Sequence, residues 1–337
     1  MSDSFFTIGA QARLGENNHL LKLNDLIDWD RIGRKLKGLH KNEVNSKGGQ
    51  IAYDALKMFK AILLGQWHNL SDPALEESLR IRVDFMIFTA FSMNDPLPDE
   101  TTFCRFRNKL VERGLIDNLL YDINKQLEES GLKVKNCDGA IVDATVIESC
   151  ARPRKVVEIV AEDRKEPDTV DIAPRVSYSH DSDAAWLKKR KKYHYGYKGF
   201  VKTDASDGYI EQVHSTPANT AEVGELEHMI EKDTRRRLFA DKGYASVSNR
   251  QLLRENKLKD GIMHKASRGN PLSFWQLMKN KLISRVRYKV ERVFGTLKRK
   301  FGMTRTRYCG LKKVCGELCL KAICFNLNKA LRKVQPT

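Results

Sequence analysis

The run AIVDATVI, in the stretch NCDGAIVDATVIESC, is short, apolar and rich in β-branched side chains, and one aspartate, Asp143, interrupts it. A run of this kind is typical of a buried strand. Aspartate is depleted from strand interiors, and it is seldom buried unless it is paired or bound to a metal. The run therefore predicts a buried strand with a carboxylate in its middle that needs a partner.

Further strands are indicated downstream of this run. The stretch YGYKGFVKTDASDGYIEQVHSTPAN contains two alternating segments joined at DASDG, which predicts a hairpin. RRRLFADKGYAS predicts another strand that ends in a turn, and SVSNRQLLRENK predicts a helix after it. Strands and helices mixed in this order favour an α/β core with helices packed on a central sheet.

Both ends of the chain are predicted to be helical. Residues 72–91 and 99–131 each open on an aspartate with acids in the first turn, and the second run ends at Gly131. These short helices suit a helix-turn-helix DNA reader and a plain helical bundle equally. From about Phe274 the apolar spacing is helical again.

The chain has a formal net charge of +17, and most of this charge lies near the C-terminus. Residues 278–337 hold 17 lysines and arginines but only two acids, Glu291 and Glu317. Such a concentration is typical of a surface that binds a polyanion, most often nucleic acid. An acidic protein partner or a solvated face would give the same pattern.

A long, charged, proline-punctuated stretch covers residues 152–192 and is expected to be an insertion in the α/β part. It ends in KKRKK, residues 188–192, next to Trp186 and Tyr193. Basic side chains interleaved with aromatic ones suit phosphate neutralisation combined with base stacking. A solvated face is the alternative.

Two more carboxylates join Asp143 as candidate site residues. Asp241 follows LFA at an expected strand end, where α/β sheets place their sites, or else it is a turn aspartate. Glu291 is the one acid in the basic stretch SRVRYKVERVFGTLKRKFG. On a helix it lies within about 40° of Arg287 and Lys298, beside an apolar stripe. A solvated pair between Arg287 and Glu291 would also explain this acid.

Three carboxylates without a cysteine–histidine cluster suit a hard cation with oxygen ligands, Mg²⁺ or Mn²⁺. Two such ions about 3.5–4 Å apart activate a nucleophilic oxygen and stabilise the leaving oxygen in phosphodiester displacement. The basic helix would then hold DNA phosphates, and its one acid would hold metal. The sequence predicts such a site at Asp143, Asp241 and Glu291.

The seven cysteines form no CxxC pair, which favours reduced thiols in a cytosolic protein. Four of them lie in an apolar helical pattern and are expected to pack as small hydrophobic groups, with zinc binding as the alternative: Cys309, Cys315, Cys319 and Cys324. No run of 18 apolar residues and no secretory leader is seen, so we expect a cytoplasmic, nucleoid-associated protein.

Six stretches occur together and in order: DPLPDETTFCRFRNKL, IVDATVI, HYGYKGFVKTD, TPANTAE, LFADKGY and SRVRYKVERVFGTLKRKFGMTRTRYCGL. From about residue 50 onwards the chain thereby resembles the DDE transposases of bacterial insertion sequences, in the insertion-sequence-five family. Two positions depart from the family pattern. Ser284 stands where the broader signature often has tyrosine, and Glu222 stands where many relatives have aspartate.

The resemblance implies a ribonuclease H-like catalytic domain at 133–337 and a helical N-terminal region at 1–132 that binds DNA ends. It also implies that Asp143, Asp241 and Glu291 are catalytic and hold two Mg²⁺, for which Mn²⁺ can substitute. DNA contacts are expected from six further residues, namely Arg287, Lys298, His194, Lys198, Arg292 and Tyr244.

On this resemblance the chain binds the terminal inverted repeats of an insertion sequence, cleaves DNA with activated water, and joins the freed 3′-hydroxyl to target DNA. Because two ends are cut and joined together, we expect a homodimer on double-stranded DNA. The alternative is a transposase-derived DNA-binding protein without recombination activity, and three intact carboxylates argue against it. A basic RNA-binding or structural protein would leave Asp143 unexplained.

Overall fold

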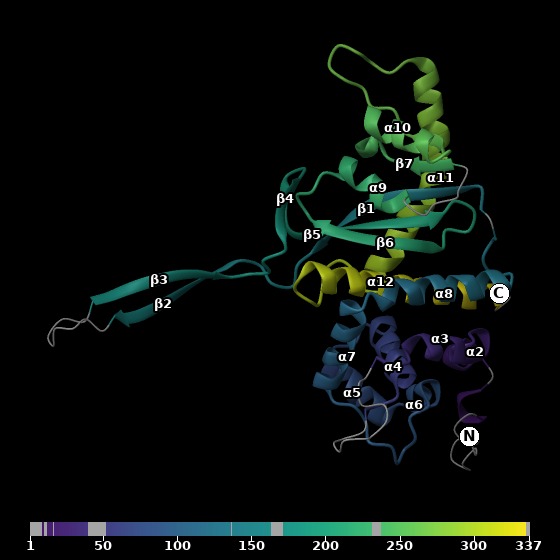
Figure 1. Cartoon of the computed structure of the whole chain (residues 1–337), viewed down its shortest axis with the longest axis vertical. Helices are drawn as coiled ribbons and strands as arrows, with labels where there is room; N and C mark the ends of the chain where they lie inside the picture. Colours follow the sequence, from purple (N-terminus) through teal and green to yellow (C-terminus); the bar gives the residue numbers. More distant parts are fainter. Residues whose placement is uncertain are drawn as a thin grey trace.

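The computed structural model describes residues 9, 12–15, 17–39, 52–135, 137–162, 171–230 and 237–334. Helices of the N-terminal part lie on one side of the C-terminal helix, and a curled sheet lies on the other (Figure 1). The α/β class that the sequence predicts is confirmed.

The described N-terminal part consists of short helices: α2 (His19–Leu26), α3 (Trp29–Leu36), α4 (Ala55–Trp67), α5 (Asp72–Ile81), α6 (Val83–Thr89), α7 (Glu100–Glu112) and α8 (Leu115–Glu129). Side-chain caps begin several of them, as where Asp99 accepts a hydrogen bond from the backbone N–H of Thr102. Each of the two long helical runs of the sequence is split in two. The backbone is extended at Arg82, and Gly114 has a φ of +61° that ordinary side chains disfavour.

The sheet is centred on β1 (Gly139–Glu148). This strand pairs antiparallel with β5 (Lys192–Asp204) and parallel with β7 (Arg237–Ala240). Three strands complete the sheet: β4 (Ala185–Lys189), which pairs with the start of β5, β6 (Ile210–Pro217), which pairs with the rest of it, and β8 (Lys259–Ile262), which runs parallel to β7. The buried strand and the hairpin predicted from the sequence are therefore β1 and the β5–β6 pair.

The pairing of β1 with β5 depends on a close approach at Gly196. A Cβ atom at this position would lie 2.2 Å from the carbonyl oxygen of Ile147, much closer than a carbon can approach. Only glycine therefore lets the two strands pair to the end of β1, which lies five residues beyond Asp143.

The expected insertion at 152–192 forms strands where it is described. Strands β2 (Arg154–Glu162) and β3 (Asp171–Ser179) pair antiparallel along nine residues each and form a ribbon that projects away from the body (Figure 1). Residues 163–170, which belong to the same insertion, lie outside the described part of the chain. The basic stretch 188–192 covers the end of β4, the turn at Arg190 and Lys191, and the first residue of β5.

The remaining helices cover the sheet or follow it: η1 (Glu222–Glu225), α9 (Leu226–Ile230), η2 (Lys242–Tyr244), α10 (Val247–Glu255), α11 (Phe274–Arg299) and α12 (Leu311–Val334). Helix α11 begins with a capping box between Ser273 and Gln276. Its middle part passes across β1 and β7, the two strands that carry Asp143 and lead to Asp241.

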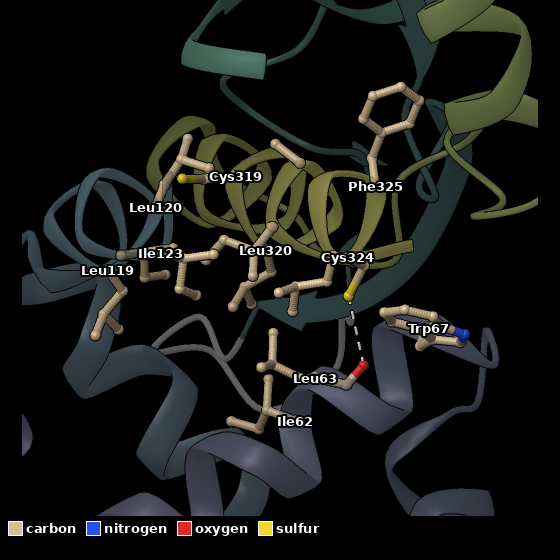
Figure 2. Packing of buried hydrophobic residues seen from close by; sticks show 14 of the residues in the cluster. Ile62, Leu63, Trp67, Leu119, Leu120, Ile123, Cys319, Leu320, Cys324 and Phe325 are labelled. Carbon is tan, nitrogen blue, oxygen red and sulfur yellow. Dashed lines mark hydrogen bonds between the residues drawn. The ribbon is translucent and has the colours of Figure 1, made fainter. Parts of the chain in front are cut away.

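Helix α12 joins the sheet to the N-terminal helices, because its side chains are buried nearly all round. Leu320 and Cys324 face α4 and α8, and the Cys324 thiol donates a hydrogen bond to the carbonyl oxygen of Leu63 (Figure 2). On another side α12 packs against β6. One hydrophobic cluster consequently contains residues of the N-terminal helices, the sheet, α11 and α12.

The segment between α11 and α12 is hydrogen-bonded to the connection between α4 and α5 and to α12 itself. The guanidinium of Arg307 donates to the carbonyl oxygens of Asn69 and Leu70, which connect α4 and α5. The backbone N–H of Arg307 donates to Glu317, whose other oxygen forms a fully buried ion pair with Lys321 at 2.8 Å.

The four C-terminal cysteines do not share one environment. Cys319 and Cys324 are buried in the core, as predicted for small hydrophobic groups. The expectation was wrong for Cys309, which is exposed and lies before α12 begins. Within the described residues, no helix combines the length and the apolar composition that crossing a bilayer requires.

Candidate active site

Asp143 lies in the middle of β1, with its side chain 15% exposed. Its neighbours Ile141 and Val142 are fully buried, which places the carboxylate at the edge of the core. One carboxylate oxygen, Oδ1, accepts a hydrogen bond from the following backbone N–H at 2.9 Å. The other oxygen therefore needs a partner from elsewhere in the fold.

Asp241 comes directly after β7, at the carboxyl end of the strand. The register pairs Val142 of β1 with Ala240 of β7, so the residue that follows each, Asp143 or Asp241, occupies the next position along two parallel strands. The shorter strand β7 has ended at this level, and sites in α/β sheets form at the carboxyl ends of strands. The turn after β7 closes through a hydrogen bond from the Tyr244 N–H to the Asp241 carbonyl oxygen.

Arg287 of α11 connects the two carboxylates. Its Nη2 donates to Oδ2 of Asp143 at 2.7 Å, and its Nη1 donates to Oδ1 of Asp241 at 3.2 Å. Its side chain is only 10% exposed. Arg287, expected at the DNA surface, is thus buried between two acids in this structure, and the pair with Glu291 considered from the sequence is not the one that forms.

Burial is the main influence on the pKa of Asp143 and raises it above the usual range. The charge of Arg287 opposes this rise but does not cancel it. The carboxylate is thus costly to ionise unless positive charge stands beside it. In this structure the guanidinium of Arg287 supplies that charge, at a place where a hard cation would find two oxygen ligands.

Tyr244 is fully buried, and its hydroxyl has no hydrogen-bond partner. Burial raises the pKa of this phenol well above the usual range, and the nearby Asp143 and Glu222 raise it further. We expected Tyr244 to contact DNA. In this structure its ring is fully buried and is not accessible to DNA.

Glu222 was noted in the sequence as a departure from the family pattern, and its position lies beside the same site. Its carboxylate is 3.6 Å from Nζ of Lys198, and its other oxygen fills the space where a Cβ of Gly243 would stand. Lys198 also donates to the carbonyl oxygen of Thr220 at 2.6 Å and is largely buried. In the sequence, the motif TPANTAE singled out the segment that ends at Glu222. The motif did not indicate that Glu222 lies near Tyr244.

Glu291 lies one helical turn after Arg287 on α11, and its side chain is exposed. Among the described residues, no three histidines, cysteines or acids converge as a metal site. The structure therefore brings two of the three predicted ligands, Asp143 and Asp241, together. The third, Glu291, lies on the helix that carries Arg287 and does not converge with them in this structure.

The other expected DNA contacts differ in how exposed they are. Arg292 is exposed, whereas His194 is partly buried and lies 3.1 Å from a carboxylate oxygen of Glu148. Lys298 is partly buried, and its pKa is lowered by burial and then by the charge of Lys189. Lys298 thus lies near the basic turn between β4 and β5.

The arrangement combines two hard oxygen ligands, a buried compensating cation and a basic surface close by. Carboxylates this close together suit Mg²⁺ or Mn²⁺ better than a soft metal. Such a site can act on a phosphate ester, since the surrounding cations attract the substrate and the acids recruit the metal.

Comparisons with known proteins agree on one family. Residues 138–327 match the family described as the transposase DDE domain, and residues 9–109 match a family described as a transposase domain. The chain is 41% identical over 268 residues to the transposase for insertion sequence element IS1106 of Neisseria meningitidis serogroup B. The match covers 78% of this chain and 86% of that protein.

Among solved structures, the chain is similar to the piggyBac transposase in its synaptic complex with hairpin DNA, determined by cryo-EM. The TM-score is 0.43 and the sequence identity 11%, over 96% of this chain and 77% of that chain. A similarity this low carries no argument about the fold or the site.

Replacement of Arg287 by methionine tests its place between the two acids. Without divalent cations we expect the free energy of unfolding to fall by about 3–5 kcal/mol, because two neighbouring carboxylates lose their counter-charge. We also expect Mn²⁺ to raise the melting temperature of Arg287→Met by more than that of the parent, since the ion no longer competes with a guanidinium. Thermal denaturation with and without Mn²⁺ measures both effects.

Arg292→Met is the matched control, because Arg292 lies on the same helix and is exposed. It should leave both quantities close to those of the parent. An equal Mn²⁺-induced shift in the parent and in Arg287→Met would show that Arg287 does not compete with the cation.

Proposed function

The chain belongs to the DDE transposases of insertion sequences, and from that premise we propose how its residues divide the work. It acts on DNA, as a transposase does. We propose that it binds the terminal inverted repeats of its element, cleaves a strand at each end, and joins the freed 3′-hydroxyl to target DNA. The observation that carries this proposal is the meeting of Asp143 and Asp241 around Arg287.

A DDE domain depends on divalent cations, and the acids at this site fit them. Asp143 within β1 and Asp241 directly after β7 offer neighbouring oxygen ligands, and Glu291 on α11 would complete the set. Mg²⁺ is the ion we propose, with Mn²⁺ as a substitute and two ions in all. Bound there, they would supply the charge that activates the attacking oxygen and stabilises the leaving one.

Arg287 has two roles in this proposal. Its guanidinium holds Asp143 and Asp241 together and compensates their charge until divalent cations take over that function. Arg287 and the cations would compete for the same carboxylates, so Asp143 and Asp241 would release the guanidinium when they held the ions. The freed group is then available for a DNA phosphate, the contact that the family resemblance suggests for this position.

We propose that the sheet with α9–α11 is a ribonuclease H-like core. The match to the transposase DDE domain over residues 138–327 supports this, as do the neighbouring positions of Asp143 within β1 and Asp241 directly after β7. The division into an end-binding region at 1–132 and a catalytic domain at 133–337 stays a proposal of the same kind. The match of residues 9–109 to a separate transposase family supports it.

DNA phosphates would be held by basic residues at the turn between β4 and β5 and along α11. The turn between β4 and β5 presents exposed basic residues, and the exposed Trp186 and Tyr193 flank it. Lys298 of α11 lies close to Lys189, which directly precedes this turn. Arg292, also on α11, is exposed. His194 and Lys198 would contact DNA only after leaving Glu148 and Thr220.

The alternative function is a DNA-binding protein without recombination activity. A pure binding protein would gain nothing from two acids that face phosphates across a basic surface, because these acids repel DNA. Asp143 and Asp241 are both in place, so we favour the enzyme. Its work on chromosomal DNA would place it at the bacterial nucleoid.

Glu291→Gln tests the third proposed ligand. We expect Mn²⁺-dependent cleavage of DNA carrying the element's own ends to fall by more than the ~10–100-fold that is typical for loss of an outer-shell group. Binding of the ends should persist. The reaction is followed by denaturing gels, and Glu227→Gln, at an exposed position on α9, serves as the matched control. Cleavage at the parental rate would remove Glu291 from the site.

Arg292→Ala tests the basic surface. We expect the slope of log Kobs against log salt concentration to decrease by about 0.9 when one phosphate contact is lost. Titration of fluorescent DNA at several salt concentrations measures this slope. Tyr244→Phe removes only a buried hydroxyl without a partner, so it should leave the slope unchanged. A change in Tyr244→Phe, or none in Arg292→Ala, would contradict the proposed surface.

We propose a homodimer on DNA, because two ends must be cut and joined in one reaction. Light scattering of the purified complex with end DNA should give the mass of two chains and two ends. A complex with a single chain holding both ends would exclude the dimer.

A further inference from the structure

Two cysteines that the proposed chemistry does not use face each other next to β1. The Sγ atoms of Cys150 and Cys309 are 3.3 Å apart, and both residues are free thiols. Cys150 follows the strand that carries Asp143, whereas Cys309 lies 159 residues later, just before α12.

The backbone around Cys150 is held firmly against the segment that precedes Cys309. Glu148 donates its N–H to the Thr304 carbonyl oxygen at 3.0 Å, and its own carbonyl oxygen accepts from the Thr306 N–H at 2.7 Å. The N–H of Cys150 donates to the Thr306 hydroxyl, and Arg305 donates to the carbonyl oxygen of Cys150 at 2.8 Å. The two chain segments therefore lie side by side without help from the sulfurs.

The other side of Cys309 is fixed as well. The N–H of Gly310 donates to Asp181 at 3.0 Å, and the N–H of Leu311 donates to Asp183 at 2.8 Å. The Cys309 side chain is nevertheless exposed, so small reagents reach it. A fixed backbone with an accessible thiol pair is what a disulfide needs in order to form without rearrangement.

We propose that Cys150 and Cys309 form a redox-sensitive pair that closes reversibly to an intramolecular disulfide. The two thiols together give up two protons and two electrons as the S–S bond forms. A peroxide accepts them and becomes water, or a small disulfide accepts them and becomes two thiols. The sulfurs approach from 3.3 Å to about 2.05 Å, a change that side-chain rotation provides.

The resting state of the pair is reduced. Partial burial and the neighbouring Cys150 thiol raise the pKa of Cys309 above the usual range, which keeps this thiol protonated at neutral pH. The thiolate is the reactive form, so the raised pKa slows attack by the Cys309 sulfur. Of the other five cysteines, Cys137, Cys319 and Cys324 are buried, and burial raises the pKa of the Cys315 thiol to about 11. The Cys104 sulfur accepts a hydrogen bond from Asn108 on its own helix α7.

The disulfide would fix a junction that matters to the active site. Strand β1 carries Asp143, and the segment with Cys309 continues from α11, which carries Arg287 and Glu291. A bond at this junction links the two elements covalently across a loop of 159 residues. Since it restricts the unfolded chain strongly, the oxidised protein should melt at a higher temperature than the reduced one.

Treatment of the full-length protein with diamide, followed by alkylation and peptide mapping by mass spectrometry, tests the proposal. We expect a peptide pair joined through Cys150 and Cys309, two hydrogen masses lighter than the thiols, which dithiothreitol separates. The melting temperature should rise on oxidation in the parent and in Cys104→Ser. It should not rise in Cys309→Ser, a substitution at an exposed side chain that leaves folding intact.

Two results would overturn the proposal. One is alkylation of both Cys150 and Cys309 under conditions that fully oxidise the exposed Cys104. The other is a crosslink that appears only after unfolding in urea, with other cysteine pairs alongside it. Neither readout involves DNA, so these experiments test the thiol pair independently of the proposed transposase activity.

Discussion

An aspartate inside a buried strand requires a positive charge beside it, and in this fold the charge comes from Arg287 on a helix 144 residues away in sequence. The requirement holds α11 across β1 and β7, because the guanidinium must reach both Asp143 and Asp241. Once α11 lies there, the segment after it meets the end of β1, and α12 is directed between the sheet and the N-terminal helices. One ion-pair cluster thereby orients the parts of the chain that the hydrophobic core then packs together.

The local elements could be predicted from the sequence because each follows from a short-range pattern. A β-branched run gave β1, two alternating segments gave the β5–β6 hairpin, and acids after a capping aspartate marked α7. Asp143 and Asp241 were expected at one site from their chemistry, whereas the pairing of β1 with β7 was not predicted. Which residues a helix contacts depends on the tertiary structure, so a sequence pattern does not predict them. The spacing put Arg287 beside an apolar stripe, but only the packed structure shows that this edge meets two carboxylates.

Tyr244 and the insertion at 152–192 are two further cases in which the local sequence pattern did not predict the tertiary structure. LFADKGY indicates a strand and a turn, but the turn is a 3-10 helix that carries the ring inward, beneath the site. Residues 152–192 are rich in charge and proline, which resembles a loop, yet β2 and β3 pair along nine residues each. Pairing between distant segments leaves little trace in local composition, because cross-strand partners supply the hydrogen bonds.

The burial of α12 has a consequence for how such proteins diversify. Two family matches divide the chain near the start of β1, yet α12 from the C-terminal part shares one hydrophobic cluster with α4 and α8 from the N-terminal part. A recombination between genes that exchanged only the first 130 or so residues would pair helices from one ancestor with an α12 shaped for another. Buried surfaces tolerate such mismatches poorly. The two halves of the sequence should therefore be inherited together, with α12 changing in step with the helices it contacts.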